Sequence, residues 1–210
     1  MFPKPSIPDT LVNTNLQKVF MERVHALEAR VFHQVALQLC DMTGNWLFVC
    51  PGTIPEAPGG NHHEDTGGLA HHLLAVEETA CRLALRYSSK DIDCDLLRFA
   101  ALFHDIGKCF EFSPQGETVY ASLGHVAIAL MLIPKLLEAE GATDAVILKV
   151  GHCLASHHGE FSQGALVEPM TKEAYILASA DRLDADLWRH EHLHGMQNVL
   201  HGHGCTKIIL

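Results

Sequence analysis

The sequence predicts an all-α fold, and three observations support this class. Apolar residues recur every three or four positions in several long segments, residues that favour helix starts precede these segments, and no segment alternates apolar and polar residues convincingly enough to suggest a strand. The chain has 210 residues, of which 48% are hydrophobic and 19% charged. This length and composition are typical of one well-buried globular domain, so we expect a single helical bundle over residues 1–210.

The first helix is expected to span about residues 9–40, because its leucines, valines and phenylalanines repeat at helical spacing. This apolar stripe would face either the core or a second copy of the chain, so the sequence leaves open whether the protein forms a homo-oligomer. Prolines and glycines then accumulate over residues 41–68, which we interpret as a long loop. Further helices are expected over residues 69–87, 91–109, 122–139, 143–156 and 171–189, with a turn at 113–116 and a second loop over 157–169.

Composition narrows the class of protein. The formal net charge of −10 argues against a protein that coats nucleic acid, although bound metal cations could supply positive charge at one small site. The seven cysteines include no C-x-x-C pair, which favours buried thiols in a reducing compartment over a disulfide framework. The N-terminus lacks an apolar signal segment and no apolar run approaches ~20 residues, so we expect a cytoplasmic protein without a membrane span.

The stretch LLRFAALFHDIGK places His104, Asp105 and Lys108 at the end of an apolar helical segment. Burying a charged carboxylate there is costly unless another charge compensates for it. Aspartate has two oxygens and can bridge two metal ions, while an imidazole donates one nitrogen to one ion, so the His-Asp pair suits a dinuclear centre. Gly107 would end the helix, and Lys108 could then point at whatever the metals bind.

A dinuclear centre needs more ligands, and suitable side chains occur in four other segments. Each segment lies within, or at the end of, an apolar helical stretch. Nitrogen and oxygen donors of this kind suit Mn, Fe, Co, Ni or Zn better than Mg alone, so we expect two divalent transition-metal ions, with Mg also allowed. The candidates are His71 and His72 in GGLAHHLL, His125 in SLGHVAI, His157 and His158 in ASHHGE, and Asp181 in ASADRLDAD.

The ordered set of His, His-Asp, His, His-His and Asp resembles the HD superfamily of metal-dependent phosphohydrolases, over about residues 61–187. The strings NHHEDTGGLAHH, FHDIGK, SHHGEFSQG and ADRLDA are most similar to two branches of it, the bacterial 3′-to-5′ exoribonucleases and the HD nucleases of type I CRISPR systems. The resemblance implies an HD-domain helical bundle in which a long Pro/Gly loop precedes the first metal-ligand helix.

The resemblance also implies a role for each matching residue. In the family's GGL-x-x-H element the metal ligand is the second histidine of the pair, which selects His72 over His71. Asp105 would bridge the two ions and Lys108 would steady the phosphoryl oxygens, so these two residues are implied to be catalytic. The first ion would bind His72, His104, Asp105 and Asp181, and the second would bind Asp105, His125, His157 and His158.

The implied reaction is hydrolysis of a phosphoester bond by a water molecule that the two ions activate. The motif set favours phosphodiester bonds of single-stranded RNA or DNA, or of a nucleotide. Three alternatives stay open: a nucleotide phosphomonoesterase, a di-iron oxygenase that resembles myo-inositol oxygenase, and a binding module that keeps the ligands without turnover. Phosphate release, iron with oxygen consumption, and metal binding without turnover would distinguish them.

Other polar residues near these motifs have two interpretations each. His62 and His63 could touch a phosphate or cover the site, or they could lie in a solvated loop. Asp184 lies about 60° around a helix from Asp181 and could reach the site, although a solvent-exposed or salt-bridge role is favoured. Several histidines near the C-terminus follow no spacing that indicates a native metal site: His190, His192, His194, His201 and His203.

Overall fold

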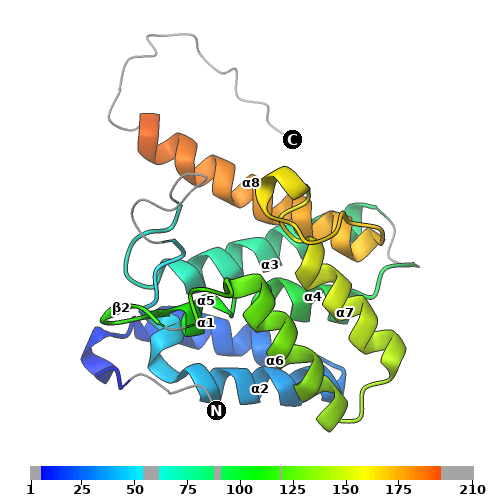
Figure 1. Ribbon diagram of the computed structural model, residues 1–210, viewed down its shortest axis with the longest axis horizontal. Coiled ribbons are helices and arrows are strands. Elements are labelled where there is room, and N and C mark those ends of the chain that lie inside the picture. The colour runs from blue at the N-terminus through cyan, green and yellow to red at the C-terminus, as the bar shows by residue number, and fades with distance from the viewer. Residues whose placement is uncertain (1–5, 54–61, 88–90, 119, 195–210) are drawn as a thin grey trace.

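The computed structural model describes residues 6–53, 62–87, 91–118 and 120–194, which form a bundle of α-helices (Figure 1). Within these ranges the only paired strands are a short antiparallel hairpin, so the predicted all-α class is confirmed. The hairpin strands are β1 (Phe112–Ser113) and β2 (Gly116–Glu117), and the 3-10 helices are η1 (Asp9–Leu11), η2 (Gly44–Phe48) and η4 (Phe161–Gln163). The α-helices are α1 (Thr14–His25), α2 (Arg30–Thr43), α3 (Gly68–Arg86), α4 (Cys94–Phe103), α5 (Lys108–Glu111), α6 (His125–Ala139), α7 (Asp144–Ser156) and α8 (Lys172–His194).

Helices α3 and α4 form the centre of the bundle. α3 packs against α4 and against α8, while α6 packs against α7. In Figure 1, α8 lies above α3, α1 and α2 lie below it, and α6 and α7 form one side. Seven of the ten residues of α4 are buried, which explains why this helix is so rich in apolar residues.

Aromatic rings connect the first two helices to α4. Phe20 of α1 meets Phe103 edge-on, with ring centroids 6.0 Å apart. Phe32 of α2 stacks on Phe99 at 5.1 Å, and Phe99 lies 5.3 Å from Phe103. All four rings are buried, so they contribute both apolar burial and ring–ring contact. This cluster therefore holds the end of α4 in place, directly before His104.

The predicted helix over residues 9–40 was wrong in one respect, because the chain breaks it into η1, α1 and α2. The break between α1 and α2 is stabilised from α4. The carboxylate of Asp95 accepts hydrogen bonds from the backbone N–H groups of Glu28 (3.0 Å) and Ala29 (2.8 Å). Arg98 donates to the carbonyl oxygen of Ala26 at 3.1 Å. These partners are more than 60 residues away in sequence, so the local apolar pattern carries no signal of the break.

The predicted helix over residues 91–109 is also divided. It begins after Asp93, whose side chain accepts a hydrogen bond from the Leu96 N–H, and it ends at Phe103. A turn then leads to α5, and Gly107 in this turn lies directly against the start of α6. A Cβ at Gly107 would lie 2.0 Å from the carbonyl oxygen of His125, so only glycine permits this approach. The turn thus brings the His-Asp pair against α6.

The predicted loop over residues 41–68 is only partly irregular. α2 continues to Thr43, and η2 buries Trp46, Leu47 and Phe48 in the core. The backbone around Cys50 hydrogen-bonds to the start of α3, through Gly67 N–H to Val49 O (3.0 Å) and Leu69 N–H to Cys50 O (3.1 Å). Residues 54–61, with Pro55 and Pro58, lie outside the described residues.

The remaining predicted elements are close to those of the structure. α3 and α7 match the expected ranges, and the Thr143 side chain caps α7 by accepting from the Val146 N–H. α6 begins at His125 rather than at residue 122, and α8 continues to His194 rather than ending near residue 189. The turn at 113–116 is the hairpin of β1 and β2. None of the described helices has the length and apolar character needed to cross a membrane.

Asp95→Ala should lower the free energy of unfolding by about 1–2 kcal/mol, because two backbone N–H groups before α2 lose a charged acceptor. The matched control is Asp91→Ala, whose carboxylate forms an exposed ion pair with Lys172, and we expect a change within about 0.5 kcal/mol. Chemical denaturation followed by circular dichroism measures both. Equal effects of the two substitutions would contradict the role assigned to Asp95.

Candidate metal centre

Two of the predicted ligands occupy the same position on different helices. His104 follows the last residue of α4, and His157 follows the last residue of α7. In each case the ring Nδ1–H donates to the carbonyl oxygen three residues earlier, Ala101 at 2.9 Å and Leu154 at 2.7 Å. A carbonyl oxygen can only accept, so Nδ1 carries the proton and Nε2 presents a lone pair. Both rings are buried, so both lone pairs point into the protein interior.

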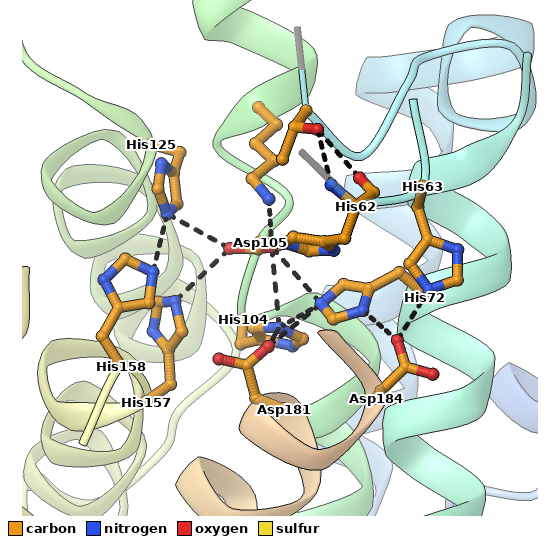
Figure 2. Close-up of polar contacts among 12 residues, drawn as sticks. His62, His63, His72, His104, Asp105, His125, His157, His158, Asp181 and Asp184 are labelled. Atoms are coloured by element: carbon orange, nitrogen blue, oxygen red, sulfur yellow. Dashed lines mark hydrogen bonds and ion pairs between the residues drawn. The ribbon is translucent and has the colours of Figure 1, made fainter. Parts of the chain in front are cut away.

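The carboxylate of Asp105 lies between two groups of histidines (Figure 2). Its Oδ1 lies 3.2 Å from His125 Nε2 and 3.3 Å from His157 Nε2. Its Oδ2 lies 3.6 Å from His72 Nε2 and 3.7 Å from His104 Nε2. Asp105 is only 2% exposed. Each oxygen of one buried carboxylate therefore faces a different cluster.

The first cluster combines side chains of α3, α8 and the end of α4. Asp181 Oδ1 lies 3.1 Å from His72 Nε2 and 3.6 Å from His104 Nε2, and the two Nε2 atoms are 3.3 Å apart. Donors that bind one ion at about 2.0–2.2 Å are separated by roughly 3–3.6 Å. The three side chains thus have the spacing of ligands to a shared cation.

The second cluster consists of Asp105, His125, His157 and His158, whose donor atoms all lie within 4.8 Å of one another. His157 Nε2 and Asp105 Oδ1 face each other as two hydrogen-bond acceptors, and within the described part of the chain neither has a hydrogen-bond partner. Two buried acceptors repel each other unless a cation lies between them. The donor set and these two unpartnered atoms both fit a metal ion.

The electrostatics of the first cluster also favour a cation. Burial alone would raise the pKa of Asp105, but Lys108 and the neighbouring histidines hold it well below its usual range. Burial would likewise raise the pKa of Asp181, and the neighbouring rings of His104 and His72 hold it well below its usual range. Burial lowers the pKa of His72, but hydrogen bonds to Asp181 and Asp184 outweigh this and raise it to about 9. The two carboxylates are therefore ionised and attract positive charge.

In the second cluster burial dominates instead. It lowers the pKa of His157, and it lowers the pKa of His158 to about 4. Both rings are neutral near pH 7, which is the form in which imidazole binds metals.

Outside the two clusters, carboxylates hold the ligand rings from behind. Asp184 Oδ2 accepts hydrogen bonds from His72 Nδ1 at 2.6 Å and from His63 Nε2 at 2.8 Å. Such partners fix the tautomer and orientation of a metal-binding histidine. Asp184 thus makes its ion pair within the site rather than on the solvent side of α8. Glu111, which sequence reasoning missed, lies 3.4 Å from His125 Nδ1. Its only sequence signal is its position three residues after Lys108.

The two adjacent histidines of α3 differ in exposure, and Lys108 lies inside the protein. His72 is buried, whereas its neighbour His71 is exposed. Lys108 is only 6% exposed and its Nζ lies 2.6 Å from Asp105 Oδ2, so it is not a surface lysine after a helix end. Among the described residues, the groups that could hold an ion do not include the α8 residues His190 and His192. The side chain of His194 and all of His201 and His203 lie outside the described part.

Asp105→Ala should abolish binding of both ions, because its two oxygens face the two clusters and no neighbouring side chain can replace both. His72→Ala should reduce binding at the first cluster only. Metal content per chain after loading with Mn²⁺ and desalting, measured by mass spectrometry of the element, distinguishes the two variants. His71→Ala is the matched control and should keep the metal content of the unaltered protein. An unchanged content in Asp105→Ala would refute the bridging assignment.

Metal uptake at about pH 7.5 should release close to one proton from His72. Its raised pKa means that the ring is protonated in the metal-free protein, and it must lose that proton before Nε2 can bind an ion. His157 and His158 should release none, because their lowered pKa values leave them neutral already. Calorimetric titration with Mn²⁺ in buffers of different ionisation enthalpy counts the protons. Release of no proton would contradict the charge state assigned to His72.

Comparison with known proteins agrees with this geometry. The profile of the HD domain matches residues 69–186. Three curated relatives are the 3′-5′ exoribonucleases YhaM of Bacillus pumilus strain SAFR-032 (37% identical over 131 residues), Bacillus velezensis strain FZB42 (36% over 135 residues) and Bacillus subtilis strain 168 (37% over 131 residues). The matched segments cover 60%, 62% and 60% of this chain.

The same segments cover 41%, 42% and 41% of the relatives, so the chain spans about two fifths of their length. No solved structure gives a significant match. The resemblance to the exoribonucleases inferred from the motifs is therefore confirmed. The HD profile covers more than half of the chain and includes both clusters, and the chain belongs to the HD domain family.

Proposed function

We propose that this protein is a metal-dependent phosphohydrolase that binds two divalent ions and cleaves phosphodiester bonds of single-stranded nucleic acid. The observation that carries the proposal is the position of Asp105, whose two oxygens face two separate histidine clusters. A dinuclear centre of this kind is typical of phosphoester hydrolysis. The likeness to proteins named 3′-5′ exoribonuclease supports a nucleic-acid substrate.

The ligand assignment follows the two clusters. Their nitrogen and oxygen donors suit Mn, Fe, Co, Ni or Zn, with Mg also allowed. Bound there, two divalent ions would supply a nucleophilic water near neutral pH and offset the charge of the phosphoryl group. The first ion is assigned to His72, His104, Asp105 and Asp181, and the second to Asp105, His125, His157 and His158.

Lys108 has a role of its own in this proposal. Its ammonium group is buried beside Asp105, where it compensates the carboxylate charge. An ammonium group carries three N–H donors, so Lys108 can retain a contact with Asp105 and also donate to a phosphoryl oxygen of the substrate. A buried positive charge at this point stabilises the additional negative charge that develops on the phosphoryl group during hydrolysis.

The charge of the chain bears on the form of the substrate. With a formal net charge of −10, the chain has no excess of basic residues to attract a polyanion over a long range. Affinity must then come from the phosphates closest to the reaction, through the ions and Lys108. This favours a single strand that enters the centre by one end over a duplex bound along its length.

A digestion assay tests the proposed function. The protein is loaded with Mn²⁺ and incubated with single-stranded RNA and DNA labelled at either end. We expect shortened 5′-labelled products and early release of the 3′-terminal nucleotide, with loss of both when a chelator is present. Asp105→Ala is the inactive control, because it removes the carboxylate shared by both clusters.

Other outcomes of these assays would assign a different function to the protein. Intact oligonucleotides with phosphate released from nucleotides would indicate a phosphomonoesterase. Bound iron with oxygen consumption, and no phosphate release from any phosphoester, would overturn the hydrolase and favour the oxygenase. Tight metal binding without turnover of either kind would indicate a binding module.

A further inference from the structure

His62 lies at the metal centre and belongs to neither of the proposed ligand sets. Its ring contacts the ring of His72 with centroids 5.0 Å apart. In Figure 2 the His62 ring points into the centre, toward Asp105 and His72, rather than out from the loop. Its Nδ1 is buried and, within the described part of the chain, has no hydrogen-bond partner. A ring nitrogen that is buried without a partner at a reaction centre calls for a ligand.

The backbone holds His62 firmly in this position. The Thr53 hydroxyl donates to the carbonyl oxygen of His62 at 2.8 Å and accepts from the His62 N–H at 3.1 Å. The next residue, His63, has a left-handed backbone with φ 52°, which is uncommon outside glycine, and its carbonyl oxygen accepts from Gly52 N–H at 2.6 Å. Strain that is held by such bonds is concentrated at functional sites.

A third metal ion is a weaker explanation for this position. His62, His63 and His72 do lie close enough to share an ion. However, His72 Nδ1 is bonded to Asp184 at 2.6 Å, and His72 Nε2 faces Asp181 at 3.1 Å, the partner with which it is assigned to the first ion. Nε2 of His63 is likewise engaged by Asp184. Among the described residues, Nδ1 of His62 is left as the ring nitrogen of this group that is buried without a hydrogen-bond partner.

We propose that His62 donates a hydrogen bond to a phosphoryl oxygen of the substrate at the metal centre. This inference rests on the proposed function, and it makes His62 a substrate contact alongside Lys108. It does not depend on the protonation state of the ring, because neutral and protonated imidazole each carry at least one N–H. The neighbouring histidine acts differently: His63 holds Asp184, which in turn holds His72.

Binding of inorganic phosphate to the Mn²⁺-loaded protein tests the contact without requiring turnover. His62→Phe keeps a ring that can pack on His72 but removes every N–H, and His62→Gln restores a donor. We expect His62→Phe to weaken phosphate binding at least about tenfold, as the loss of a hydrogen bond to a charged group would, while His62→Gln recovers most of the affinity. Calorimetry gives the dissociation constants. Metal content should stay that of the unaltered protein in both variants.

His71→Phe provides the matched control, because His71 is an exposed histidine beside the site, and its phosphate affinity should not change. Unchanged phosphate affinity in His62→Phe would overturn the proposal and leave a packing role only. A reduced metal content in that variant would overturn it in favour of a ligand role.

The same titrations separate this inference from the proposed function. If His62→Phe loses phosphate affinity but the unaltered protein cleaves no phosphoester, the contact stands and the proposed function fails. If the unaltered protein cleaves RNA and His62→Phe keeps both phosphate affinity and rate, the function stands and the contact fails. Absence of phosphate binding by the metal-loaded unaltered protein would overturn both.

Discussion

The arrangement of the helices around the site depends on the burial of one ionised carboxylate, that of Asp105. An ionised group with so little contact with water is stable only if positive charge and donors surround it. Lys108 supplies a positive charge at 2.6 Å, and four histidine rings approach the two oxygens at 3.2–3.7 Å. Those rings come from α3, the ends of α4 and α7, and the start of α6. Two of these rings, those of His104 and His157, face the carboxylate with lone pairs, so a cation would have to lie between them and Asp105. Such a site requires most of the bundle to be correctly assembled.

The packing around the metal centre depends on close backbone contacts as well as on side chains. Gly107 lets the turn after α4 lie against the start of α6, and Gly68 lets the start of α3 lie against the carbonyl oxygen of His63. A Cβ at Gly68 would lie 1.9 Å from that oxygen. The aromatic cluster around Phe103 fixes the end of α4 immediately before the His-Asp pair. Core packing and ligand geometry are therefore parts of one constraint.

The HD domain family supplies the framework of the site, whereas the choice of substrate depends on what surrounds the two clusters. In this chain the surroundings are Lys108, the His62–His63 segment and the outer carboxylates Asp184 and Glu111. The outer groups orient the rings, and the inner groups remain directed at the centre. Two adjacent histidines in one loop therefore belong to different groups. His63 is hydrogen-bonded to the outer carboxylate Asp184, while His62 packs on the ring of His72.

The sequence by itself determined the helical class, the approximate ranges of α3, α6, α7 and α8, and the residue types that meet at the centre. These follow from local properties, namely apolar periodicity, capping residues such as Thr143, and polar side chains that end apolar helices. The choice of His72 over His71 came from the resemblance to a family, and the burial of His72 agrees with it.

Only the tertiary structure decided the rest, because the deciding contacts join residues far apart in the chain. The break between α1 and α2 depends on Asp95 and Arg98 of α4, and the division after Phe103 depends on the close approach of Gly107 to α6. The two-sided position of Asp105, and the parts played by Asp184, Glu111 and His62, likewise appear only when six helices, α3 to α8, converge. Periodicity records which side of a helix is buried, but it does not record which atom of another helix that side will meet.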